Sequence, residues 1–331
     1  MQPLSQGKYH EQTRPFKAKR HNLRIRLALL KAARSNPTIQ AGLKEMCRRD
    51  CVFWIDHLVI QINPDTMEKG PFITWDYQEK AILGGTIKVG DEEREQSGLL
   101  ECVVDRKDVR WPKSRDGGAS WVVLEVMVWL GMLQTMPVHC GIISRDEDAV
   151  DAINDPNSLF EKIRTILDHL PDWMKGNARK NTKKMSTKFD NGNTITGEAN
   201  VSSAKVGGRQ TIMLIDEFGQ FDKNGEAIFD FTRDVCKCRV FVFTHKDQTG
   251  MAYRLCYDAR FSEMREIMTH WSQHPRKRPG LYRWDEKKND VEVLDKTFNF
   301  NAICNHNVPK DKKCPECRKL GGFQFFDFVQ R

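Results

Sequence analysis

The chain has 331 residues, the length of two modest domains or one large one. Hydrophobic residues make up 39% and charged residues 30%, which supplies enough apolar mass for a core and argues against wholesale disorder. The formal charge of +8 has a local origin, because residues 1–50 hold 12 Lys or Arg and 3 Asp or Glu. No apolar run is long enough to span a bilayer, and the first residues show no signal peptide. We therefore expect a cytoplasmic protein with reduced cysteines.

Residues 1–70 are expected to form a basic arm followed by helices. Residues 1–21 are polar and basic, and leucines at helical spacing predict a helix over residues 22–34. A second apolar stripe predicts one continuous helix over residues 38–60. The arm can contact DNA phosphates or a protein partner, although a solvated tail has the same composition.

Residues 71–275 alternate between short apolar runs and helical segments, which is typical of a three-layer α/β domain. The runs at 211–215 and 239–243 suit strands buried on both faces of a parallel sheet. Asn191-Gly192 predicts a hairpin with a type I′ turn. The other predicted elements are strands at 108–112 and 139–144 and helices at 120–134, 146–154 and 158–170.

A candidate phosphate-binding loop, WPKSRDGGAS at residues 111–120, lies between a predicted strand and a helix. Glycines let the backbone approach phosphate, and the helix N-terminus offers free N–H groups. Ser120 stands where a hydroxyl can bind Mg²⁺. The pattern departs from GxxxxGK[ST], because Ala119 fills the lysine position while Lys113 and Arg115 stand at the start of the loop. An ordinary strand-to-helix turn containing glycine is the alternative interpretation.

A candidate pair of catalytic carboxylates, Asp216 and Glu217, ends the apolar run at 211–215. An Asp at such a strand end can hold Mg²⁺ through water, and the next Glu can orient and deprotonate the attacking water. Many strands end in Asp, so the run alone is weak evidence. With a phosphate loop about a hundred residues earlier, it indicates a nucleoside triphosphatase.

Two further segments fit the same site. Thr244 and His245 follow the run at 239–243, and in a parallel sheet they are expected beside the phosphates, where a hydroxyl can sense the γ-phosphate. The alternative is an ordinary turn. Gln78 lies upstream of the loop, and its amide matches the edge of adenine, unless it sits on an exposed helix face.

Together these segments resemble the large terminase subunits of tailed bacteriophages, the motors that package DNA. KSRDGGASW at 113–121 resembles their deviant Walker A motif, in which the lysine often stands at the front, and residues 212–217 resemble their Walker B motif. Thr244 resembles part of the coupling motif, with His245 in place of a commoner small residue. Residues 71–78 resemble the adenine motif. Further similar segments are SLFEKIRTILDHLPDWM at 158–174, DNGNTITG at 190–197 and HWSQHPRKRPGLY at 270–282, within an overall resemblance over about residues 50–295.

The resemblance implies a role for each matching residue. Lys113 stands for the phosphate lysine, Arg115 for an arginine acting on the γ-phosphate in cis, and Glu217 for the residue that activates water. Asp216 and Ser120 stand for the Mg²⁺ ligands. The ATP-binding loop comprises Lys113, Ser114, Arg115, Asp116, Gly117, Gly118, Ala119 and Ser120, with Gln78 at the adenine.

The resemblance also implies a P-loop NTPase fold, a mostly parallel sheet flanked by helices, with an N-terminal helical region and a short C-terminal extension. The implied function is ATP hydrolysis that drives double-stranded DNA into a procapsid in the host bacterial cytoplasm. Implied partners are the DNA, the portal protein, the small terminase subunit and further copies of the chain in a ring. After residue 295 too few residues remain for the nuclease domain of the family, so we expect no nuclease activity from this chain.

Residues 276–331 are expected to form a lid or linker remnant with a possible zinc site. Cys304, His306, Cys314 and Cys317 supply four ligands suited to tetrahedral Zn²⁺, although reduced cysteines without metal are an equal alternative.

Two rival functions remain open. A helicase-type or other DNA-translocating ATPase shares the chemistry, but it would need a second motor domain for which the chain has no room. A non-catalytic DNA- or portal-binding remnant of a prophage terminase is favoured by Ala119. Residues 175–188 form a second basic segment, which can face DNA or be a solvated loop.

Overall fold

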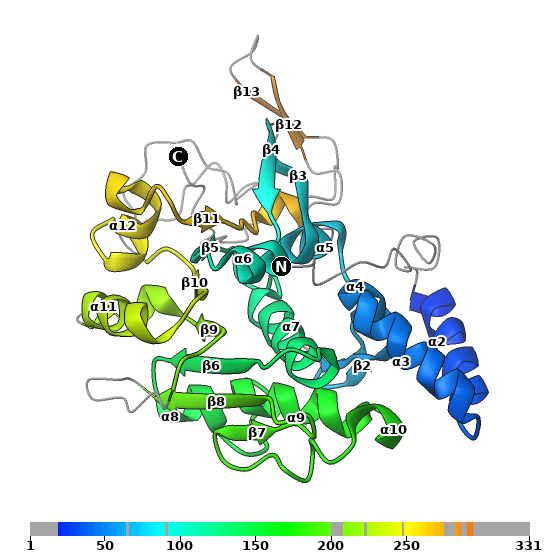
Figure 1. Ribbon diagram of the computed structural model, residues 1–331. Coiled ribbons are helices and arrows are strands. Elements are labelled where there is room, and N and C mark those ends of the chain that lie inside the picture. The colour runs from blue at the N-terminus through cyan, green and yellow to red at the C-terminus, as the bar shows by residue number, and fades with distance from the viewer. Residues whose placement is uncertain are drawn as a thin grey trace.

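The structure is a computed structural model that describes residues 19–63, 66–89, 92–199, 208–221, 224–246, 248–274, 282–285 and 290–293. Its centre is a seven-stranded sheet in the order β11-β5-β10-β9-β6-β8-β7 (Figure 1). All neighbouring strands are parallel except β7 and β8, which confirms the predicted, mostly parallel sheet. The strands are β5 (Val109–Pro112), β6 (His139–Ser144), β7 (Ser186–Lys188), β8 (Thr194–Ala199), β9 (Ile212–Ile215), β10 (Arg239–Phe243) and β11 (Arg265–Glu266).

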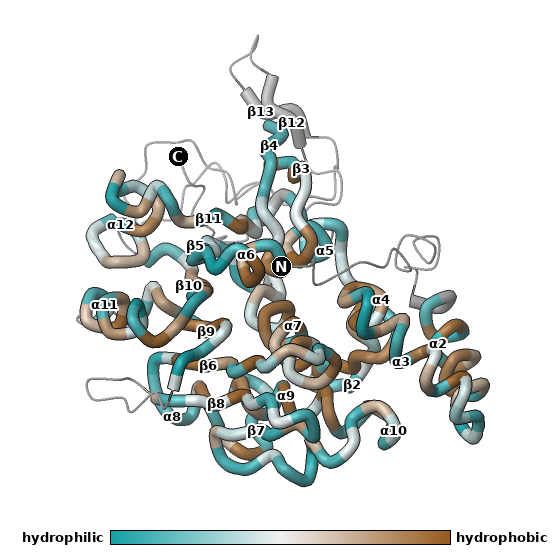
Figure 2. Tube along the Cα trace, in the orientation of Figure 1, coloured by the Kyte–Doolittle hydropathy of each residue, from teal (hydrophilic) through white to brown (hydrophobic). Residues whose placement is uncertain are grey.

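Helices cover both faces of this sheet. In β9, Ile212 and Leu214 join the core on one face, while Met213 and Ile215 join the core on the other, because successive side chains of a strand point to opposite sides. The first face is covered by α7 (Ala119–Leu133) and α9 (Leu159–His169), and the second by α11 (Gly225–Val235) and α12 (Met251–Tyr257). Figure 2 shows the mainly hydrophobic α7 in the middle of the molecule. The predicted three-layer arrangement is therefore present.

The N-terminal region forms α2 (Lys19–Ala33), α3 (Pro37–Arg49) and α4 (Cys51–Leu58). The continuous helix predicted over residues 38–60 is wrong, because the chain breaks at Asp50, which is extended (φ −138°). The Asp50 carboxylate accepts a hydrogen bond from the Phe53 N–H at 2.9 Å and so starts a new helix. Asp is a favoured N-cap residue, but the prediction followed the apolar periodicity that continues on both sides of Asp50.

Helices α3 and α4 share the core with α7. The indole Nε1 of Trp129 in α7 donates to the carbonyl of Cys47 at 2.8 Å, and Gln134 Nε2 donates to that of Arg48 at 3.0 Å. Cys47 and Cys51 are fully buried, and burial raises the pKa of both thiols well above the usual value. These contacts pack the helical region directly against the helix that follows the candidate phosphate loop.

A hairpin of β3 (Gly84–Val89) and β4 (Glu92–Ser97) projects from the body of the molecule (Figure 1). It is inserted between α5 (Asp76–Leu83) and α6 (Leu99–Asp105). Most of β4 is exposed, and its charged sequence lacks the alternation that predicts a strand.

The remaining elements are β1 (Ile60–Ile62), β2 (Lys69–Pro71), α8 (Glu147–Asp151), α10 (Asp172–Lys175), the 3₁₀ turns η2 (Phe218–Gln220), η3 (Ala259–Phe261) and η4 (Trp271–Gln273), β12 (Tyr282–Asp285) and β13 (Asp290–Val293).

The predicted hairpin of β7 and β8 is confirmed, but its turn is not type I′. Only Gly192 of the Asn-Gly pair has a positive φ (87°). The Asn191 side chain donates to the carbonyls of Gly131 and Gln134 at 2.9 and 3.0 Å. The turn therefore caps the C-terminus of α7, and this tertiary contact replaces the local preference of the pair.

Within the described ranges, no helix combines the length and the hydropathy required to cross a membrane.

Candidate functional site

The sheet brings the predicted functional segments to one edge. Parallel strands β5, β10, β9 and β6 all end there, and the carboxyl edge of such a sheet is the usual place for a ligand. Strand β10 lies between β5 and β9, with Phe243 opposite Pro112 and Phe241 opposite Ile215. The candidate phosphate loop, Thr244 and the Asp216–Glu217 pair therefore emerge side by side, and the role of Thr244 toward the γ-phosphate stays a prediction.

The candidate phosphate loop is held by backbone contacts on both flanks. The Lys113 N–H donates to the carbonyl of Phe243 at 2.9 Å, and the Ser114 N–H donates to that of Thr269 at 2.8 Å. Beyond these anchors Arg115 and Asp116 are exposed. Asp116 has a left-handed backbone (φ 59°), an unusual conformation for a residue other than glycine. Lys113 and Arg115, at the start of the loop, and the exposed Asp116 therefore lie at the carboxyl edge of the sheet.

Both glycines of the loop are required by close approaches. A Cβ on Gly117 would lie 2.6 Å from Thr269 Cγ2. Gly118 has a positive φ (73°), and a Cβ there would lie 2.6 Å from Gln78 Nε2. Helix α7 begins directly afterwards without a side-chain cap, so its first N–H groups face the loop. Ala119, in the usual lysine position, is 2% exposed.

Gln78 lies directly behind this loop. It is buried, its Oε1 accepts from the Trp75 N–H at 3.0 Å, and its Nε2 donates to the Gly117 carbonyl at 3.2 Å. The hydroxyl of Tyr77 donates to the same carbonyl at 3.0 Å. The first turn of α5 therefore supports the loop, and adenine recognition by Gln78 stays a prediction.

The hydroxyl of Ser120 donates to Asp216 Oδ1 at 2.9 Å, although 96 residues separate the two. A contact of 2.9 Å is an ordinary O–H···O hydrogen bond, and it brings two oxygen groups together at the start of α7. Hydroxyl and carboxylate oxygens are the ligands that Mg²⁺ prefers. Both residues therefore fit a Mg²⁺ that a nucleotide would bring.

Glu217 follows Asp216 with a left-handed backbone (φ 53°, ψ 34°). Its Oε2 forms an ion pair with Nη1 of Arg145 at 2.8 Å, and both side chains are about half-exposed. The proximity of Glu217, followed by the hydrogen bond to Asp146, raises the pKa of Arg145 above its usual value. The Glu217 carboxylate thus lies at the carboxyl edge of the sheet beside the positive charge of Arg145. No sequence motif indicated Arg145 as a functional residue.

Lys162 is a second functional candidate that the sequence did not reveal. It lies near the start of α9, where its Nζ donates to the Asn157 carbonyl at 2.7 Å. Burial lowers its pKa, the nearby positive charge of Lys113 lowers it further, and the charges of Asp216 and Glu217 oppose both effects. The direction of these effects is what associates Lys162 with the candidate site, while its Nζ is bonded to Asn157. In the sequence, Lys162 is a lysine within a predicted helix, and no pattern marks it as functional.

His245 connects the end of β10 to α12. Its ring contacts that of Phe243, with centroids 5.3 Å apart, and lies 6.4 and 6.1 Å from those of Tyr253 and Tyr257 on α12. The two tyrosine rings lie 4.4 Å from each other. These ring contacts join the segment after Thr244 to α12.

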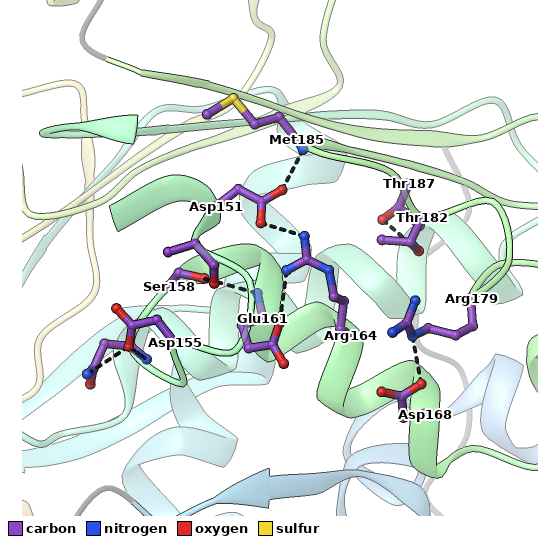
Figure 3. A network of polar contacts seen from close by, with 12 residues as sticks. Asp151, Asp155, Ser158, Glu161, Arg164, Asp168, Arg179, Thr182, Met185 and Thr187 are labelled. Carbon is purple, nitrogen blue, oxygen red and sulfur yellow. Dashed lines mark hydrogen bonds and ion pairs between the residues drawn. The ribbon is translucent and has the colours of Figure 1, made fainter. Parts of the chain in front are cut away.

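Residues 175–188, here called the basic loop, contain six Lys or Arg and no Asp or Glu. Figure 3 shows the buried contacts that fix it: Asp151 accepts from Arg164 through one oxygen and from the Met185 N–H, at 2.6 Å, through the other. Arg179 pairs with Asp168 at 2.6 Å, and Lys184 pairs with Glu147. Exposed lysines without an acidic partner among the described residues are Lys180, Lys183 and Lys188.

The predicted zinc ligands Cys304, His306, Cys314 and Cys317 lie outside the described residues, so this site stays a prediction. Within the part of the chain that is described, no group of three or more His, Cys, Asp or Glu side chains is arranged to hold a metal ion.

No protein-family model matches the chain, and no curated protein matches it either. Among solved structures, it is similar to the crystal structure of the HK97 bacteriophage large terminase, with 9% sequence identity and a TM-score of 0.44. The similarity covers 67% of this chain and 43% of that chain, so the protein spans less than half the length of that terminase.

Proposed function

We propose that this chain is the ATP-hydrolysing motor subunit of a phage-type terminase and translocates double-stranded DNA into a procapsid. The observation that carries the ATPase part is the contact of Ser120 with Asp216 at 2.9 Å, at the start of α7 and beside Glu217. The terminase part is supported by the order and spacing of the motifs, from residues 71–78 through the loop and the carboxylates to Thr244.

In the proposed site, the phosphates of ATP lie against the loop and the first N–H groups of α7. Ser120 and Asp216 would hold Mg²⁺, which when bound neutralises phosphate charge and orients the β- and γ-phosphates. Lys113 and Arg115, at the start of the loop, offset the charge that develops on the γ-phosphoryl oxygens. Arg145 adds a further cation at the same edge.

Glu217 is the proposed general base. It accepts a proton from a water whose oxygen forms a bond to the γ-phosphorus, while the bond from that phosphorus to the bridging oxygen of ADP breaks. The change in charge then acts on Thr244 at the neighbouring strand end, and the ring contacts of His245 pass the movement to α12. This movement is the proposed power stroke on DNA.

The decisive experiment measures phosphate release by the purified chain with Mg²⁺-ATP, with and without double-stranded DNA. Glu217→Ala is expected to lower turnover about 10²-fold or more, because the base is lost. The matched control is Glu45→Ala, which removes another partly exposed, ion-paired glutamate, on α3. The control is expected to leave turnover unchanged, and DNA is expected to stimulate the wild type.

The second candidate function, a non-catalytic remnant that binds DNA or the portal, is favoured by one observation: Ala119 places a buried methyl group where the usual pattern has its lysine. Equal, background-level turnover in the wild type and Glu217→Ala would favour this remnant over the motor. Hydrolysis that depends on Glu217 but does not respond to DNA would retain the ATPase and reject translocation.

A further inference from the structure

Arg145 stands at the end of β6, next to the strand that carries the candidate carboxylates. The Asp216 N–H donates to the carbonyl of Ile143 at 2.9 Å, and this register sets Arg145 beside Glu217. Its guanidinium contacts three acceptors: Nη1 lies 2.8 Å from Glu217 Oε2 and 3.3 Å from Gln220 Oε1, and Nε donates to Asp146 Oδ2 at 3.0 Å. It therefore links the carboxylate of Glu217 to the 3₁₀ turn η2 that follows it.

The pair is poorly placed to contribute to stability. Its two side chains are 45% and 36% exposed, and exposed ion pairs usually contribute between 0 and about 1 kcal/mol. The arrangement instead restricts orientation. The planar guanidinium is itself oriented by the hydrogen bonds of Nε to Asp146 and of Nη1 to Gln220, so the charge facing Glu217 has a fixed position that the single ammonium of lysine would not reproduce. Glu217 also has a left-handed backbone, so its side chain leaves the main chain in an uncommon direction. A contact at the carboxylate can hold the side chain in that direction.

We propose that Arg145 is the positioning residue for Glu217. The ion pair draws Oε2 toward Arg145 at 2.8 Å without an aligned hydrogen bond, so it orients the carboxylate by charge and leaves the second oxygen to accept the proton of the attacking water. This inference rests on the proposed ATPase function and adds to it the residue that orients the base. In this role Arg145 acts through Glu217. The competing role is direct action of Arg145 on the γ-phosphate, and a double-mutant cycle distinguishes the two.

The test compares kcat and KM for ATP in the wild type and in Arg145→Ala. The variant is expected to lose about tenfold or more in kcat with KM within about threefold, because a misdirected base affects the transition state and not nucleotide binding. Arg145→Lys is expected to recover part of the loss, since it restores the charge without the planar guanidinium. The matched control is Arg48→Ala, which removes an arginine of similar exposure (35%) paired with Glu45 at 2.6 Å on α3, and is expected to leave kcat unchanged.

A double-mutant cycle with Glu217→Asp decides between the two roles. The shortened carboxylate no longer reaches Arg145, so Arg145→Ala is expected to cost less than about threefold in that background. The same loss of kcat in both backgrounds would mean direct action on phosphate and would overturn the proposal, as would a wild-type kcat in Arg145→Ala. Failure of the proposed ATPase function gives a different result, because the ATP turnover of the wild type would then equal the background turnover of Glu217→Ala. The ATPase function and the role of Arg145 would then both be rejected.

Discussion

At the scale of single residues, Glu125 conflicts most with its surroundings. It is a carboxyl group in the middle of α7, it is fully buried, and neither oxygen has a hydrogen-bond partner among the described residues. Burial raises its pKa well above the usual value, the negative charge of Asp56 raises it further, and Arg26 opposes both. Folding therefore favours the protonated acid, which reduces the cost of a buried polar group in the core.

This environment predicts a pH-dependent effect of Glu125→Gln. A folded pKa above the unfolded value stabilises the protein at low pH, and that stabilisation is lost as the pH rises from about 4.5 through the folded pKa. Gln does not titrate, so the variant is expected to gain on the wild type between pH 5 and 8, by up to about 1.4 kcal/mol for each pH unit that lies below the folded pKa of Glu125. Urea denaturation at both pH values measures the difference. The control is Glu263→Gln, whose side chain is 86% exposed, and equal shifts in the two variants would contradict the explanation.

At the scale of elements, the basic loop is a charged surface segment whose backbone is held in place by buried polar contacts. The Met185 N–H is fixed to Asp151, whose other oxygen binds the buried Arg164 (Figure 3). A loop held in this way loses little conformational entropy when it binds a ligand. We therefore expect its exposed lysines to suit the phosphates of a DNA backbone.

We predict that Lys180→Ala with Lys183→Ala weakens DNA binding uniformly across sequences. Each lost phosphate contact is expected to reduce the slope of log K against log salt by about 1, while ATP turnover without DNA stays unchanged. The matched control is Lys44→Ala with Lys237→Ala, two exposed lysines on other elements. Equal salt slopes in the two double variants would show that the basic loop does not contact DNA.

At the scale of the whole molecule, the excess charge and the core lie in different parts of the chain. Residues 1–50 carry 12 Lys or Arg against 3 Asp or Glu. Part of this segment nevertheless belongs to the packed body, because Asn22 donates to the Asp56 carbonyl at 2.6 Å, and Arg26 donates to those of Val59 and Phe72 at 2.8 and 2.7 Å. A truncation that tests the arm should therefore end before α2.

Deletion of residues 1–18 is predicted to weaken binding to DNA or a partner while ATP turnover without DNA persists. The deleted segment is basic, and α2 with its buried Asn22 and Arg26 remains intact. Turnover and DNA affinity of the truncated and full chains can be measured side by side. A collapse of turnover without DNA would show that the arm also supports the nucleotide site.

The sequence alone determined most of the local elements. Short apolar runs predicted the buried parallel strands, and helical periodicity predicted α7 and α9, because these patterns depend on neighbouring residues. The loop between strand and helix and the Asp-Glu pair were visible for the same reason. The break at Asp50 and the charged β3–β4 hairpin were missed, since a local capping bond and a solvated strand lack such a pattern.

Only the tertiary structure decided which residues meet. It inserted β10 between β5 and β9, joined Ser120 to Asp216, placed Gln78 behind the loop, and set Arg145 against Glu217. These partners lie far apart in the chain, and their contacts follow from the order of strands in the sheet and the packing of its helices. A local pattern carries no information about such neighbours, because they are selected by the burial of whole faces and not by the spacing of adjacent residues.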